Sequence, residues 1–160
     1  MDVDRDFLGQ LEALHSSKVL ILGIGNVLKG DDGAGPAVCE KLKSLEIRAE
    51  VMDAGTVPEN YIGPIIKRSP ENLLIVDATD FGATPGSIKL FETGQLSSYA
   101  FSTHTLSPHL FVDMIRKEID VEVYLIGIQP EQVELGQPLS ESVSRAVESL
   151  CRCLEELFAA

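Results

Sequence analysis

The chain has 160 residues, of which 44% are apolar, so it is long enough for one domain with a core and too short for two ordinary ones. Its net charge of −12 argues against nucleic acid or an anionic membrane as a partner, and we find no apolar run long enough to span a bilayer. The acidic first fourteen residues lack the basic start and apolar centre of a signal peptide, and the three cysteines show no disulfide framework. We therefore expect a cytoplasmic protein.

Apolar runs alternate with helical patterns along the chain, which is typical of an α/β layer fold. The first seventeen residues form an N-terminal extension, in which Phe7, Leu8, Leu11 and Leu14 share one face of an expected helix over residues 4–14. Ser107 and Ser140 are placed to cap later helices. Strands are predicted at residues 19–23, 49–52, 73–76, 88–91 and 121–126, and helices at 33–44, 59–67, 108–118 and 141–158.

The connection between the third and fourth strands, residues 77–86, is rich in turn-forming residues and too short to contain a crossover helix. A parallel return would need such a crossover, so we expect the fourth strand to run antiparallel to the others. Residues 1–160 are therefore predicted to form a single three-layer α/β/α sandwich with a mostly parallel five-stranded sheet.

A glycine-rich segment, residues 25–36, follows the first predicted strand and leads into a helix. A dinucleotide-binding loop needs a small residue at position 28, which is Leu28, and a phosphate-binding loop needs Lys-Ser/Thr where Asp31 and Asp32 stand. Two adjacent carboxylates would repel phosphate and attract a cation instead. For Asp31 the pattern favours capping of the helix that follows.

Polar side chains follow the predicted strands, where ligands gather in open α/β sheets. Asp32 follows the first strand, Asp53 ends the second, Asp77 ends the third, and His104 follows the fourth. Two carboxylates and an imidazole suit a divalent metal of the zinc, nickel or manganese type, with coordination positions left open. Each residue also has a structural alternative: the aspartates can cap turns, and the histidine can be a hydrogen-bonded loop residue.

Five segments, taken together and in this order, resemble the hydrogenase maturation endopeptidases, which process the large subunit of nickel–iron hydrogenases. The likeness is greatest to the hydrogenase-3 branch of that family. These segments are residues 25–35, 53–60, 74–80, 103–104 and 127–130.

The resemblance implies that Asp32, Asp77 and His104 are the metal-contacting residues and that Asp53 is a further acidic position that orients the substrate or the ligands. It also implies an aspartyl-type endopeptidase activity that removes a C-terminal extension from the hydrogenase large-subunit precursor after nickel insertion. The nickel would be supplied by the substrate, with no organic cofactor, and the enzyme is expected to act as a monomer.

Other functions are compatible with parts of the pattern. The sequence has neither the serine-nucleophile motif of the α/β-hydrolases nor the zinc-protease His-Glu-x-x-His helix. A non-catalytic nickel-binding chaperone could use the same three ligands. A receiver domain of a signalling system would use Asp77 as phosphoacceptor, but it needs a lysine after the fifth strand, where residues 127–130 have none. Cys39, Cys151 and Cys153 are expected to pack in helices.

Overall fold

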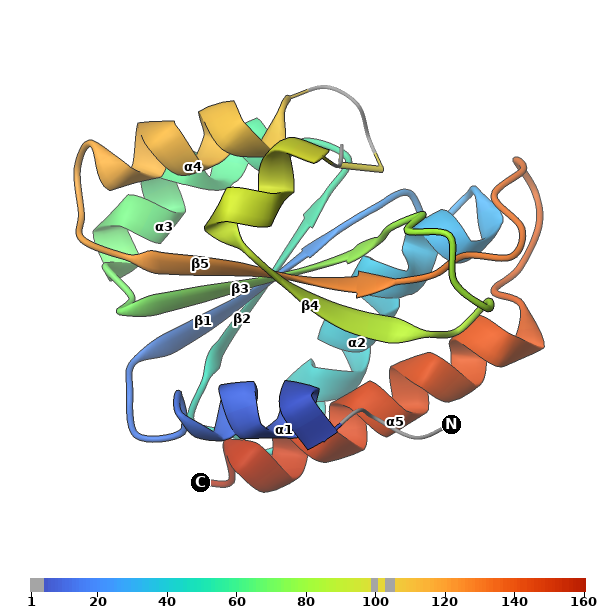
Figure 1. Cartoon of the computed structure of the whole chain (residues 1–160), viewed down its shortest axis with the longest axis horizontal. Coiled ribbons are helices and arrows are strands. Elements are labelled where there is room, and N and C mark those ends of the chain that lie inside the picture. Colours follow the sequence, from blue (N-terminus) through green and yellow to red (C-terminus); the bar gives the residue numbers. More distant parts are fainter. Residues whose placement is uncertain (1–4, 99–100, 103–105) are drawn as a thin grey trace.

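The computed structural model describes residues 5–98, 101–102 and 106–160, which form a five-stranded sheet between two layers of helices (Figure 1). The strands lie in the order β2-β1-β3-β5-β4, so that β1 and β3 are central and β2 and β4 form the edges. Their bounds are β1 Val19–Ile24, β2 Glu50–Gly55, β3 Asn72–Ala78, β4 Ile88–Glu92 and β5 Glu122–Ile128.

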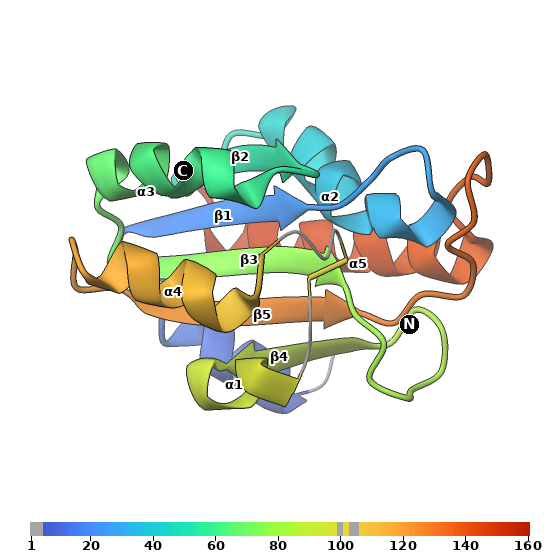
Figure 2. The ribbon, with the colours of Figure 1, turned by 90° about the horizontal axis from the view of Figure 1, so that it is seen from above.

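The sheet is parallel except at one edge, as the short connection after the third strand predicts. β1 pairs in parallel with both β2 and β3, and β3 pairs in parallel with β5. β4 runs antiparallel to β5, with Ile88 opposite Ile128 and Glu92 opposite Tyr124. Viewed from above, the parallel strands all end at one side of the molecule (Figure 2). The expected mixed sheet is therefore confirmed.

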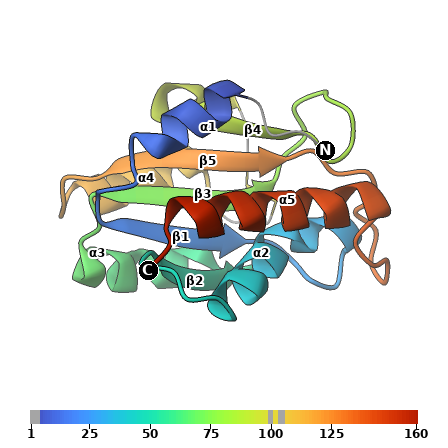
Figure 3. The ribbon, with the colours of Figure 1, turned by 90° about the horizontal axis from the view of Figure 1, so that it is seen from below.

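The helices are divided between the two faces of the sheet, because every second side chain of a strand points to the same face. One core cluster joins α1, α2 and α5 to residues such as Ile21 and Val76, and the other joins α3 and α4 to residues such as Leu22 and Ile75. Figure 3 shows α1, α2 and α5 lying over the first of these faces. The helices are α1 Arg5–Glu12, α2 Ala34–Lys43, α3 Ile62–Arg68, α4 Pro108–Arg116 and α5 Glu141–Leu157, with short 3₁₀ helices η1 Gly30–Gly33, η2 Pro58–Tyr61 and η3 Thr93–Ser98.

The N-terminal extension contributes a helix to the core, as expected. Phe7, Leu11 and Leu14 are buried in the cluster that also contains α5. Leu8 was expected on the same face but is partly exposed, since one helical step turns it by about 100° from Phe7 to the edge of the buried stripe. Among the helices in the described part of the chain, none is long and apolar enough to cross a membrane.

Two predicted helix caps are present. The Ser107 hydroxyl oxygen accepts a hydrogen bond from the Leu110 amide at the start of α4, and that of Ser140 accepts one from the Val143 amide at the start of α5. Each bond satisfies an amide that has no partner within its helix. The cap at Ser140 also fixes the end of the loop that follows β5, which is part of the site described next.

Candidate active site at the carboxyl ends of the central strands

Glycines bring the segment after β1 into close contact with the ends of the central strands. A Cβ atom on Gly35 would lie 2.3 Å from the carbonyl oxygen of Ile24 and 2.4 Å from that of Val76, so α2 begins directly over β1 and β3. A Cβ on Gly25, whose φ is +149°, would lie 1.8 Å from the carbonyl oxygen of Asp32. Larger side chains at these two positions would push Asp32 away from the end of β3. The glycine-rich segment therefore serves close packing, and its conformation places a carboxylate rather than a phosphate at the strand ends.

Asp77 is more deeply buried than Asp32 and Asp53 and stands at the end of β3. Ser102 holds both of its oxygens: the backbone amide donates to Oδ2 at 2.8 Å, and the hydroxyl donates to Oδ1 at 2.6 Å. Burial raises the pKa of Asp77 to about 8, the hydrogen bonds from Ser102 oppose that rise, and the negative charge of Asp32 adds to it. The two carboxylates thus interact electrostatically at the point where the order of the strands reverses.

Asp32 lies in η1 and is almost fully buried, with the ammonium group of Lys29 3.9 Å from Oδ2. Asp53 lies one strand further out, because β2 pairs with β1 on the side away from β3. It is half-buried, and its carboxylate accepts a hydrogen bond from the Gly55 amide at 2.9 Å. The structure therefore brings Asp32 and Asp77 together and leaves Asp53 at the margin.

His104, the third predicted metal ligand, lies outside the described residues. Among those that the structure does describe, no three histidine, cysteine, aspartate or glutamate side chains gather closely enough to hold a metal ion. Ser102, two residues before His104, contacts Asp77 directly. The described part of the site is thus a pair of carboxylates, which is a donor set suited to sharing a divalent cation with other ligands.

Asp31 does not cap the following helix, and the prediction that it does so is wrong. The cap position of α2 is occupied by Gly33, with no side-chain hydrogen bond there. The fully buried carboxylate of Asp31 turns instead to the loop after β5. Its oxygens accept hydrogen bonds from the amides of Glu131, Gln132 and Ser140 and from the hydroxyl of Ser140, at 2.7–3.0 Å. Asp31 therefore fastens two loops that flank the site.

The loop between β3 and β4 is held by Gln129, a residue to which the sequence reasoning gave no role of its own. Its side-chain oxygen accepts hydrogen bonds from the amides of Phe81 and Ala83 at 2.8 and 3.2 Å, and its amide nitrogen donates to Asp80 at 3.0 Å. The hydrogen bond from Gln129 also lowers the pKa of Asp80. The motif 127–130 places a glutamine after a strand, but its partners lie 46–49 residues away and nothing local in the sequence identifies them.

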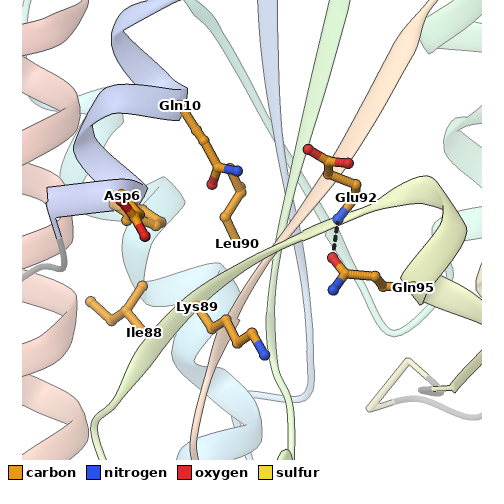
Figure 4. Close-up of a pocket in the computed structure, with 8 residues that line it drawn as sticks. Asp6, Gln10, Ile88, Lys89, Leu90, Glu92 and Gln95 are labelled. Carbon is orange, nitrogen blue, oxygen red and sulfur yellow. Dashed lines mark hydrogen bonds between the residues drawn. The ribbon is translucent and has the colours of Figure 1, made fainter.

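Two other features lie apart from this acid pair. A pocket between α1 and β4 is lined by polar side chains such as Gln10, Lys89 and Glu92, and neither Asp32 nor Asp77 is among its lining residues (Figure 4). The cysteines are free thiols, as their spacing indicates, and burial raises the pKa of Cys39 to about 12.

Comparison with known proteins places the chain in one family. A family model described as hydrogenase maturation protease matches residues 36–156. The hydrogenase 3 maturation protease of Escherichia coli K12 is 36% identical over 138 residues, which cover 85% of this chain and 88% of that protein. A putative hydrogenase maturation protease of Methanocaldococcus jannaschii is 33% identical over 153 residues and covers 90% of both chains.

Solved structures show the same fold. The crystal structure of the [NiFe] hydrogenase maturation protease HycI from Thermococcus kodakarensis superposes with a TM-score of 0.84 at 31% identity, covering 92% of this chain and 97% of that one. The solution structure of the endopeptidase HycI from Escherichia coli gives a TM-score of 0.78 at 35% identity, covering 87% and 90%. The chain thus shares its α/β/α fold with proteases and endopeptidases, and its class is that of a peptide hydrolase. The chain belongs to the hydrogenase maturation protease family, and its HycI members are among its close relatives.

Proposed function

We propose that the protein removes the C-terminal extension of a nickel–iron hydrogenase large-subunit precursor once nickel has been inserted. The observation that carries the proposal is the buried pair Asp32 and Asp77, at the reversal of strand order, in a chain of this protease family. A precursor cut only after metal loading requires that the enzyme detect the metal. Carboxylates held at the carboxyl ends of strands are suited to that task because they add ligands to a metal that is already partly coordinated.

In this proposal the nickel arrives with the substrate, and Asp32, Asp77 and His104 contact it. Carboxylate and imidazole groups are ordinary ligands for such a metal. Ser102 holds both oxygens of Asp77 and so fixes the direction in which this carboxylate faces. Asp53 stands at the margin of the pair and is proposed to orient the approaching precursor. No organic cofactor is required.

The proposed reaction is hydrolysis of one peptide bond. Water adds to the scissile carbonyl carbon, the bond to nitrogen breaks, and the departing amine takes a proton. When bound, the substrate's nickel would supply Lewis-acid polarisation near that carbonyl. The contribution of the chain is to bind the loaded precursor and orient it so that the scissile bond lies beside the carboxylates. We further propose that it acts in the cytoplasm, as a monomer that docks transiently.

The test is a processing assay with the purified protein and its host's precursor, prepared with and without nickel and analysed by mass spectrometry. Loss of one C-terminal peptide from loaded precursor alone is the expected result. Asp77→Asn and Asp32→Asn should abolish it, while Asp120→Asn, an exposed aspartate ahead of β5, serves as the matched control. Binding of loaded precursor without cleavage would instead favour a nickel-binding chaperone. Cleavage by Asp77→Asn at the normal rate would refute the role of the acid pair.

A further inference from the structure

Two turns beside the acid pair expose aliphatic side chains to solvent. Leu135, Val27 and Leu28 are 75%, 66% and 64% exposed, and Val133 is 41% exposed. In the part of the chain that the structure describes, the first three are the most exposed large hydrophobic side chains. We call these four residues the apolar rim. They come from segments about a hundred residues apart in the sequence, the loop after β1 and the loop after β5.

The two turns that carry the rim are hydrogen-bonded to each other. The Gly136 amide donates to the carbonyl oxygen of Leu28 at 2.8 Å, and the Gly30 amide donates to that of Gln137 at 3.0 Å, so the two turns are joined backbone to backbone. The buried carboxylate of Asp31 fastens them from below. The side chains of the rim are therefore exposed on turns that have a defined hydrogen-bonded structure. Backbone hydrogen bonds fix these turns in a conformation in which the aliphatic side chains point to solvent and make no contribution to the hydrophobic core.

The rim adjoins the candidate active site. Leu28 is followed by Lys29, whose ammonium group lies 3.9 Å from the carboxylate of Asp32. The loop after β1 and the loop after β5 lie side by side at the end of the molecule where the parallel strands finish, in both Figure 1 and Figure 2. The apolar rim therefore lies at the same end of the molecule as Asp32, within reach of a macromolecule that binds there.

We propose that the apolar rim is the docking surface for the folded body of the hydrogenase large-subunit precursor. The inference rests on the proposed function, and it names the part of the enzyme that binds the partner. The protruding aliphatic side chains offer apolar contact area, and charged side chains such as those of Lys29, Glu131 and Glu134 stand among and beside them. Apolar contacts with charged groups at their border are the arrangement of a protein–protein interface, which favours a protein surface as the occupant. Contacts at the rim bind the precursor equally well before and during the reaction, so they contribute to affinity rather than to the chemical step.

The experiment compares the wild-type protein with the double variant Leu28→Ser/Leu135→Ser on nickel-loaded precursor. Met114→Ser, which changes an exposed side chain near the end of α4, is the matched control. The double variant should raise KM at least tenfold and leave kcat within twofold, while the control changes neither. In an Asp77→Asn background, which blocks cleavage, the two serines should weaken binding to the precursor by the same factor.

The outcomes separate this inference from the proposed function. If the wild-type protein leaves loaded precursor intact, the proposed function fails. If the wild type cleaves and the double variant keeps its KM and affinity, the docking surface is wrong while the function stands. A wild-type dimer in sedimentation that the two serines dissociate, with KM unchanged, would assign the rim to contact between copies of this chain and would also overturn the inference. Denaturant unfolding of all variants confirms that the substitutions at exposed positions leave the fold intact.

Discussion

Replacing Asp31 by alanine should destabilise the protein strongly, although the residue takes no part in the proposed chemistry. Its carboxylate is fully buried and accepts four hydrogen bonds, from the amides of Glu131, Gln132 and Ser140 and from the Ser140 hydroxyl. Alanine would leave all four donors without this partner. The backbone hydrogen bonds between the loop after β1 and the loop after β5 would remain.

The magnitude follows from the burial of the donors. A buried donor that loses its partner costs about 1–3 kcal/mol. The two Ser140 groups are buried, whereas the amides of Glu131 and Gln132 are partly exposed and can bind water instead. We therefore expect a loss of about 3–5 kcal/mol in the free energy of unfolding, a large part of the ~5–15 kcal/mol typical of a domain.

Urea unfolding followed by circular dichroism measures this loss directly. Asp53→Ala is the control, because its half-buried carboxylate accepts one hydrogen bond, from the Gly55 amide, and its removal should cost no more than about 1 kcal/mol. A loss below about 1 kcal/mol for Asp31→Ala would show that water replaces the carboxylate, and the reasoning would be refuted.

Three further predictions concern the site. The pKa of Asp77 is raised from 3.8 to about 8, so between these pH values the folded chain retains a proton that the unfolded chain releases, and the free energy of unfolding falls as pH rises. Asp77→Asn removes this dependence. In urea unfolding from pH 4 to 8, the free energy of unfolding of the variant should therefore rise relative to that of the wild type by up to about 1.4 kcal/mol per pH unit. A constant difference would contradict this. Ser102→Ala removes the hydrogen bond from the hydroxyl to Asp77 and should slow precursor processing about tenfold, while Ser102→Thr, which keeps a hydroxyl, should restore part of the rate. Equal rates for the wild type and both variants would exclude a positioning role for Ser102. Gly35→Ala places a Cβ within 2.4 Å of two carbonyl oxygens and should cost about 3 kcal/mol or more in thermal or urea unfolding, whereas Gly63→Ala, with open space in α3, should be neutral or stabilising.

The fold could be predicted closely from the sequence because its signals are local. Apolar runs such as 73–76 are buried on both faces, which is the pattern of a central parallel strand. The antiparallel edge strand follows from the length of one connection, since no crossover helix fits between residues 77 and 86. Ser107 and Ser140 indicate the starts of two helices, because serine is a preferred capping residue. None of these inferences needs knowledge of distant contacts.

The site could be predicted only in part, because its remaining features depend on which loops meet. Asp77 and Asp32 follow strands that the topology places side by side, so their proximity was predictable. The partners of Asp31 lie about a hundred residues away, and nothing local distinguishes a carboxylate that reaches them from one that caps a helix. The support that Gln129 gives to the loop after β3 is of the same kind.

The adjacent residues Asp31 and Asp32 illustrate how one short motif can combine a stabilising contact with a proposed site residue. Successive side chains of a 3₁₀ helix point about 120° apart, so two neighbouring carboxylates in η1 must face different surroundings. Asp31 faces the loop after β5 and accepts four hydrogen bonds, whereas Asp32 lies near enough to Asp77 for its charge to raise the pKa of that carboxyl group. Substitution of either residue should reduce precursor processing, but for different reasons. Rates corrected for the folded fraction should recover for Asp31→Ala and remain low for Asp32→Ala, and the converse pattern would reverse the two assignments.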